Sequence, residues 1–233
     1  RSSRTLKASD LRIRENGVEQ TIRDVRLERP PAHFAFVVDR SLSMGDGRLE
    51  AALRAVTSEL SQLREGDTAS LVMFNHHVTP GRAIRTGDDL VHQSSGMVPS
   101  GGTSLRDALA SIASPDRTYA IVITDGGDRN SELSDEVALQ LISGTKTIVS
   151  AIVLGSTASF LDRAATNTGG AIVRANAGSI GSALHGLLTD INSRYLVVYQ
   201  SNTSNRGWRS VEVRPQRSGV RVLAARKGYF AAP

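Results

Sequence analysis

Short apolar runs alternate with helix-spaced apolar residues through the middle of the chain. The run at 33–39, HFAFVVD, is almost continuously apolar, which is typical of a strand buried on both faces. The runs at 119–124 and 147–154 have the same character. Residues 68–75 and 77–84 read as a pair of adjacent strands, and 171–175 reads as a further strand. Apolar residues at helical spacing predict helices over 49–63, 104–113, 135–142, 159–167 and 179–191. We therefore expect a doubly wound, mostly parallel central sheet with helices on both faces, an α/β fold.

The two ends of the chain follow a different pattern. Residues 11–28 alternate apolar and polar positions around Asn16-Gly17, which predicts a β-hairpin. After residue 193, strand-like segments follow one another without an intervening helical pattern, at 194–200, 208–215 and 220–230. We expect them to form a small antiparallel satellite sheet with the N-terminal hairpin. The predicted organisation is an N-terminal flank at 1–30, an α/β domain at 31–193 and a C-terminal flank at 194–233.

Composition narrows the class of protein. Of the 233 residues, 39% are hydrophobic and 22% are charged, which is ordinary for a globular domain. No apolar run approaches the roughly 18 residues of a membrane helix, so no membrane span is expected. The chain has no cysteine, which excludes disulfides and thiolate metal sites. We expect a monomer.

The net charge of +5 raises the question of nucleic acid. Aromatic residues make up only 4% of the chain, which leaves few side chains to stack on bases. The arginines of the first thirty residues are interspersed with acidic residues, Asp10, Glu15, Glu19, Asp24 and Glu28. This is a mixed surface and not a basic block, so we expect no nucleic-acid partner.

Oxygen-bearing side chains follow two of the buried strands. The segment VVDRSLSMGD ends one strand at Asp39 and then places Ser41 and Ser43 in steps of two, which point the same way in extended backbone. Another strand ends at Asp125, and the glycine-rich segment SGGTSL brings Thr103 between them in sequence. Sites in open α/β sheets form at the carboxyl ends of strands, so we expect these five residues to meet in one crevice.

The five side chains offer only oxygen. Hard oxygen donors suit Mg²⁺, Mn²⁺ or Ca²⁺, and we expect Mg²⁺. Two carboxylates barely balance the charge of a divalent ion, and Mg²⁺ requires six oxygens. The set therefore predicts an open position that accepts an oxygen from outside the chain.

The segments DRSLS, GGTSL and TDGGD resemble the metal-ion-dependent adhesion site of von Willebrand factor type A domains. The resemblance covers about residues 32–192. It implies that Ser41, Ser43 and Thr103 ligate the metal. It also implies that Asp39 and Asp125 ligate it or hold its waters, and that an Asp or Glu carboxylate of a partner protein fills the open position. The flanks, at 9–22 and 226–230, resemble those of bacterial, mostly exported relatives. Arg40 departs from the family pattern, in which a smaller or neutral residue is common.

These observations predict a metal-dependent interaction or adhesion module, located outside the bacterial cytoplasm and without catalytic activity. Because the chain begins at Arg1, we expect a signal segment to be missing from it. Two alternatives stay open: a Mg²⁺-dependent hydrolase or phosphotransferase built on Asp39, and a structural domain with a vestigial site. A phosphoaspartyl phosphatase needs a second aspartate two residues on, where this chain has Ser41.

His76 and His77 are expected to serve a strand end or loop, because neighbours on a strand face opposite sides.

Overall fold

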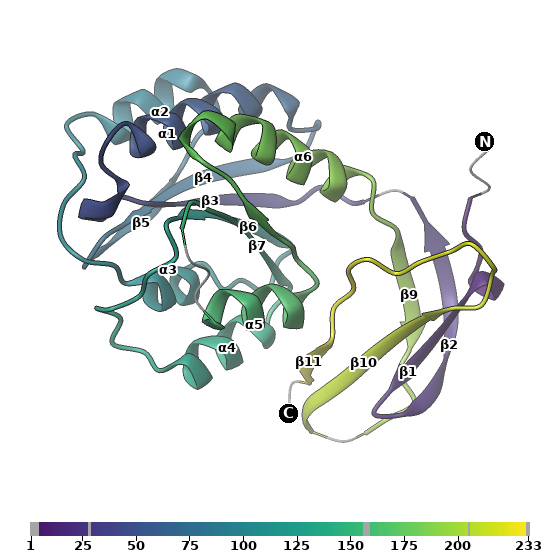
Figure 1. Cartoon of the computed structure of the whole chain (residues 1–233). Coiled ribbons are helices and arrows are strands. Elements are labelled where there is room, and N and C mark those ends of the chain that lie inside the picture. The colour runs from purple at the N-terminus through teal and green to yellow at the C-terminus, as the bar shows by residue number, and fades with distance from the viewer. Residues whose placement is uncertain (1–4, 28, 156–158, 205, 232–233) are drawn as a thin grey trace.

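The computed structural model describes residues 5–27, 29–155, 159–204 and 206–231. Residues 1–4, 28, 205 and 232–233 of the predicted flanks, and residues 156–158 of the predicted α/β domain, lie outside these ranges. The described residues form a larger α/β unit and a separate antiparallel sheet beside it (Figure 1). No helix among the described residues is long and apolar enough to cross a membrane.

The larger sheet has six strands in the order β5-β4-β3-β6-β7-β8. Neighbouring strands run parallel, except that β5 runs antiparallel to β4. The bounds are β3 His33–Asp39, β4 Thr68–Phe74, β5 Val78–Ala83, β6 Thr118–Thr124, β7 Thr147–Val153 and β8 Ile172–Arg174. The fold class expected from the alternating pattern is confirmed.

Register aligns the carboxyl ends of the central strands. Asp39 at the end of β3 pairs with Phe74 on β4, and Val38 pairs with Ile123 on β6. Thr124 therefore ends β6 at the level of Asp39. The loops that follow β3 and β6 leave the sheet side by side at this edge.

Helices cover both faces of this sheet (Figure 1). One face carries α1 Arg48–Glu59, α2 Gly87–Ser94 and α6 Ile180–Asn192, and the other carries α3 Leu105–Ser111, α4 Asp135–Ser143 and α5 Ser159–Thr168. Short 3-10 turns lie at Ala8–Asp10, Leu42–Met44, Leu60–Gln62 and Ala177–Ser179. Helix α2 was not predicted, although Thr86 and Asp89 form a capping box at its start that marks it in the sequence.

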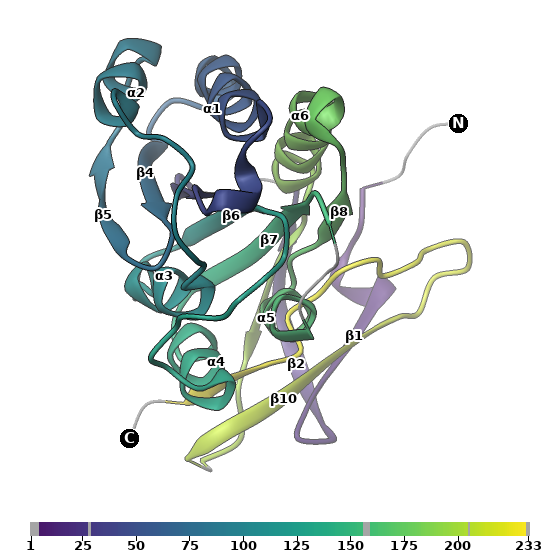
Figure 2. The same cartoon turned by 60° about the vertical axis from the view of Figure 1, so that its left-hand side comes forward.

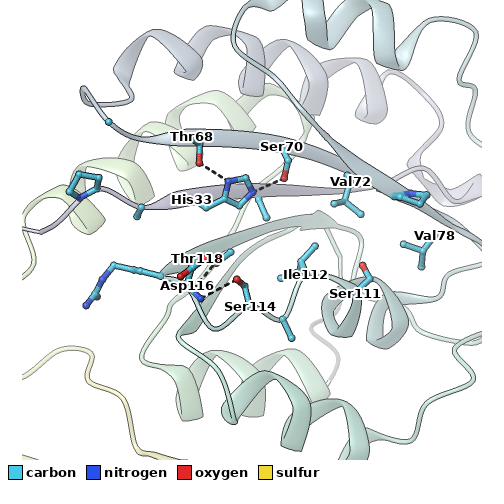
Figure 3. A pocket seen from close by; sticks show the side chains of 18 residues that line it. His33, Thr68, Ser70, Val72, Val78, Ser111, Ile112, Ser114, Asp116 and Thr118 are labelled. Carbon is cyan, nitrogen blue, oxygen red and sulfur yellow. Dashed lines mark hydrogen bonds between the residues drawn. The ribbon is translucent and has the colours of Figure 1, made fainter.

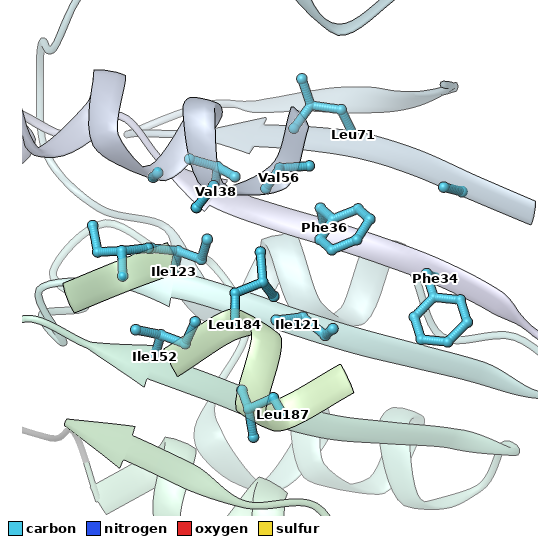
Figure 4. Close-up of a cluster of buried hydrophobic side chains, with 14 of the residues drawn as sticks. Phe34, Phe36, Val38, Val56, Leu71, Ile121, Ile123, Ile152, Leu184 and Leu187 are labelled. Atoms are coloured by element: carbon cyan, nitrogen blue, oxygen red, sulfur yellow. The ribbon is translucent and has the colours of Figure 1, made fainter. Parts of the chain in front are cut away.

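Alternate side chains of β3 enter the two hydrophobic cores, one on each face of the larger sheet. Phe36 is fully buried on the face where Val56 of α1 and Leu184 of α6 also lie (Figure 4). Ala35 and Val37 belong to the cluster on the opposite face. Because β3 is buried on both sides, it provides a rigid base for the loop that follows Asp39.

The second sheet has five strands in the order β11-β10-β1-β2-β9. The bounds are β1 Leu11–Glu15, β2 Val18–Arg26, β9 Leu196–Gln200, β10 Gly207–Pro215 and β11 Gly228–Ala231. Strands from both ends of the chain therefore share one antiparallel satellite sheet, as expected. The domain boundaries at 30 and 193 stay a prediction.

The last strand, β11, begins only at Gly228, whereas the sequence predicts an extended segment over 220–230. The residues before β11 pair with the α/β unit instead. The guanidinium of Arg226 donates to the carbonyls of Ser143 and Thr145 at the end of α4, over 2.7 and 2.6 Å. The amide of Lys227 donates to the carbonyl of Asn167 over 3.1 Å. These bonds hold the C-terminal segment beside α4, where its yellow ribbon runs in Figure 2.

The buried side chain of Glu15 links the strands of the satellite sheet by hydrogen bonds. Its carboxylate is fully buried on β1, and it accepts hydrogen bonds from Tyr199 on β9 and Tyr229 on β11, over 2.8 and 2.9 Å. The hydroxyls of Ser201 and Thr203 donate to it as well. Burial acts to raise the pKa of Glu15, but these hydrogen bonds outweigh it and lower the pKa to about 2. One carboxylate therefore connects the two edge strands of the sheet.

Candidate metal centre

The first candidate segment follows β3. Asp39 is fully buried; its Oδ1 accepts from the amide of Ser41 over 2.7 Å, and its Oδ2 accepts from the hydroxyl of Thr124 over 2.6 Å. The hydroxyl oxygens of Ser41 and Ser43 lie 3.1 Å apart. The chain is extended at Ser41 but then enters the Leu42–Met44 turn, which the sequence analysis did not expect. The turn still brings the two serine hydroxyls together.

The loop carrying Thr103 is attached to this segment by backbone hydrogen bonds. The amide of Leu42 donates to the carbonyl of Gly101 over 3.1 Å, and the amide of Ser100 donates to the carbonyl of Arg40 over 2.9 Å. Thr103 is 7% exposed. The two segments that contain the three predicted hydroxyl ligands therefore lie against each other.

The loop after β6 is attached to Thr103 in turn. The carbonyl of Thr103 accepts from the amides of Arg129 and Asn130, each over 3.0 Å. The amide of Thr103 donates to Oδ1 of Asn130 over 3.0 Å. All three candidate segments are thus joined at one edge of the sheet, and Asp125 begins the third of them.

The two aspartates influence each other. Burial raises the pKa of Asp39, the hydrogen bonds from Thr124 and Ser41 oppose this, and the negative charge of Asp125 raises the pKa further. The net effect is a raised pKa. A cation beside both carboxylates would offset their burial and repulsion.

The donor set fits a hard divalent cation. In the described ranges, the carboxylate of Asp125 and the hydroxyl of Thr103 form no hydrogen bond or ion pair within the chain. Their oxygens are therefore available to a ligand. No group of three or more His, Cys, Asp or Glu side chains that could hold a metal ion occurs among the described residues. A metal here would depend on the hydroxyls, which suits Mg²⁺ better than zinc or copper.

Two asparagines were missed by the sequence analysis. Asn75 is 1% exposed, and its side-chain amide donates to the carbonyl of Ser100 over 2.9 Å. Its backbone carbonyl accepts from the amide of Ser104 over 2.6 Å. Asn130 holds Thr103 as described above. No local pattern marks either residue, because each acts on a segment distant in sequence.

Arg40 is half-buried beside Asp39. Its Nη1 donates to the hydroxyl of Ser100 over 3.3 Å, while its Nε is buried without a partner. The guanidinium is therefore held against the loop that carries Thr103.

His76 and His77 lie in the turn between β4 and β5, and the centroids of their rings are 4.2 Å apart. The expectation that they face opposite sides is wrong, because the turn brings the two rings together. Their expected place at a strand end or loop agrees with the structure.

A cavity of about 960 Å³ lies at the end of the sheet opposite the candidate metal centre (Figure 3). His33 at the start of β3 lines it, with its ring nitrogens 2.9 and 2.8 Å from the hydroxyls of Thr68 and Ser70. Burial lowers the pKa of His33. Both nitrogens of this imidazole are therefore already paired within the chain.

Comparison with known proteins finds a similarity to one domain family. Residues 34–127 match the model of the von Willebrand factor type A domain. The chain is 26% identical, over 149 residues, to the mouse inter-alpha-trypsin inhibitor heavy chain H2; the match covers 54% of this chain and 15% of that protein. The chain thus spans only a small part of the curated relative that it matches.

Two solved structures share the fold. BatB from Bacteroides thetaiotaomicron is 18% identical, with a TM-score of 0.55, and the match covers 69% of this chain and 97% of that one. The mussel byssus proximal thread matrix protein 1, in a structure with a zinc-occupied metal-ion-dependent adhesion site, is 15% identical, with a TM-score of 0.61; the match covers 78% and 50%. The resemblance noted in the sequence is confirmed: residues 34–127 match the von Willebrand factor type A domain, and the described chain shares the fold of solved proteins with that domain.

Proposed function

We propose that this chain is a protein-interaction module that holds a divalent cation, with Mg²⁺ preferred over Mn²⁺ and Ca²⁺. Domains of this family are commonly used in protein–protein interaction. In this proposal the cation is held by Asp39, Ser41, Ser43, Thr103 and Asp125. The observation that carries the proposal is the joining of three oxygen-bearing segments at one sheet edge, with the side-chain oxygens of Thr103 and Asp125 left unpaired among the described residues.

The side chains have different parts in this proposal. The hydroxyls of Ser41, Ser43 and Thr103 ligate the cation directly, and their neutrality leaves it electrophilic. Asp39, whose carboxylate is fixed by Ser41 and Thr124, orients the site and balances charge. When bound, the cation supplies a position that accepts an oxygen of the partner. An Asp or Glu carboxylate fits best, because it is anionic and compact.

We propose that the module has no catalytic activity. A phosphotransferase would need Asp39 as a free nucleophile, but both oxygens of this carboxylate accept hydrogen bonds and the residue is fully buried. This arrangement favours a positioning role for Asp39. We also propose a monomer that works outside the bacterial cytoplasm, as the resemblance of the flanks to exported relatives suggests.

Affinity capture tests this function. The immobilised chain is exposed to envelope proteins of the source cell in Mg²⁺ and in EDTA, beside the Ser43→Ala variant. Ser43 is exposed, so its hydroxyl can be removed with little effect on folding. We expect partners that need Mg²⁺ and are lost with Ser43→Ala. Partners retained equally in EDTA and by the variant would place binding on another surface.

A further inference from the structure

An exposed leucine lies between two of the proposed metal ligands. Leu42 separates Ser41 from Ser43 and is 72% exposed. Single exposed apolar residues are common on protein surfaces. Leu42 is unusual because its backbone is fixed on both sides: its amide donates to Gly101, and its carbonyl accepts from Gly45, each over 3.1 Å. The turn thus presents this side chain from a rigid position.

The same turn buries its other large apolar residue. Met44 is 0% exposed and belongs to the core beneath α1. On the adjoining loop, Val98 is 62% exposed, two residues before Ser100, whose amide bonds to Arg40. Exposed apolar side chains therefore stand on both loops that carry the proposed hydroxyl ligands.

Two arginines accompany these apolar residues. Nη1 of Arg48 donates to the carbonyl of Ser43 over 2.9 Å, and Nη1 of Arg40 donates to the hydroxyl of Ser100 over 3.3 Å. Within the described ranges, neither guanidinium forms an ion pair. Asp46 is exposed nearby and offsets one of the two charges. Since the cation would balance Asp39 and Asp125, the surface around it stays positive.

We infer that the partner's coordinating carboxylate is flanked by a bulky apolar residue, which packs on Leu42 and Val98, within an acidic segment that faces Arg40 and Arg48. This inference rests on the proposed function. The occupant is a polypeptide segment and not a small carboxylic acid, because a small acid would leave Leu42 uncovered. Burying this side chain gives the affinity, and the arginines steer the acidic segment to the site.

Two labelled peptides test the inference by fluorescence polarisation in Mg²⁺. One has the sequence Gly-Glu-Leu-Asp-Leu-Glu-Gly, and in the other serine replaces both leucines. We expect the leucine peptide to bind about tenfold more tightly, since burying one leucine contributes on this scale. In Leu42→Ser this preference should fall to about twofold or less. Leu141→Ser, which removes a leucine that is 46% exposed on α4, is the matched control and should keep the preference.

The possible outcomes distinguish the inference about the partner from the proposed metal centre. Equal affinity for both peptides, or an unchanged preference in Leu42→Ser, would overturn the inference. If Mg²⁺ binds but neither peptide does, the inference also fails while the metal centre stands. If the wild-type chain binds no Mg²⁺ in calorimetry, the proposed function itself fails.

Discussion

Asn130 provides a sharp test of how the candidate centre is held together. Its Oδ1 accepts the amide of Thr103 over 3.0 Å, and its own amide donates to the carbonyl of Thr103 over 3.0 Å. A Cβ at position 102 would lie 1.8 Å from this Oδ1, so the contact requires Gly102. The loop after β6 thereby positions a proposed ligand that belongs to another loop.

Replacing Asn130 by alanine removes the acceptor and leaves the buried amide of Thr103 unpaired. Such a loss costs about 1–3 kcal/mol. The two backbone bonds to the Thr103 carbonyl persist, so the chain should still fold. If about 1–2 kcal/mol of this free energy is lost from cation binding because Thr103 is no longer held in place, the affinity for the cation drops about 5- to 30-fold. Asn130→Asp keeps an acceptor oxygen for the amide of Thr103. Its affinity for the cation should therefore stay within about threefold of the wild-type value.

Calorimetric titration with Mg²⁺ measures the affinity, and thermal denaturation without metal confirms that each variant is folded. A purely structural role for Asn130 would lower the melting temperature and leave the affinity unchanged. A folded Asn130→Ala variant with wild-type affinity would therefore refute the reasoning that Asn130 positions Thr103.

The remaining predictions concern the satellite sheet. The folded pKa of Glu15 is about 2, below its ordinary value of 4.5, so its stabilisation is present above pH 4.5 and is lost as pH falls toward 2. Glu15→Gln should therefore lower the melting temperature at neutral pH by more than at pH about 3, and an equal loss at both would contradict this. Arg226→Ala should lower the free energy of unfolding by about 1–3 kcal/mol, because two carbonyls at the end of α4 lose their donor; an unchanged urea midpoint would argue against this. A chain of residues 30–193 should be less stable than the full chain, and equal stability would show that the satellite sheet is independent.

Much of the fold could be predicted from local pattern. The continuous apolar run ending at Asp39 identified a strand buried on both faces, and both flanks were recognised from their alternation. Two features escaped because they depend on distant partners. The segment before β11 alternates like a strand, yet Arg226 and Lys227 pair with α4 and with the end of α5. Asn75 and Asn130 act on a loop far away in sequence.

The candidate ligands could be proposed from the sequence because their residue types and spacing are visible in it. The turn and the hydrogen bonds that position these ligands could not be predicted. The Leu42–Met44 turn replaces extended backbone, and the contacts that join the three segments follow from strand register. The side-chain oxygens of the centre are thus readable from the sequence, while the hydrogen bonds that place them are tertiary.

Calorimetric titration of Mg²⁺ into the wild-type chain and into Ser43→Ala tests the central claim most directly. Ser43 is exposed, and its hydroxyl bonds only to that of Ser41 among the described residues, so the variant should melt like the wild type without metal. We expect one bound ion in the wild type, and at least about a tenfold loss of affinity when this proposed direct ligand is removed. Identical Mg²⁺ binding by both chains, or no binding by the wild type, would contradict it.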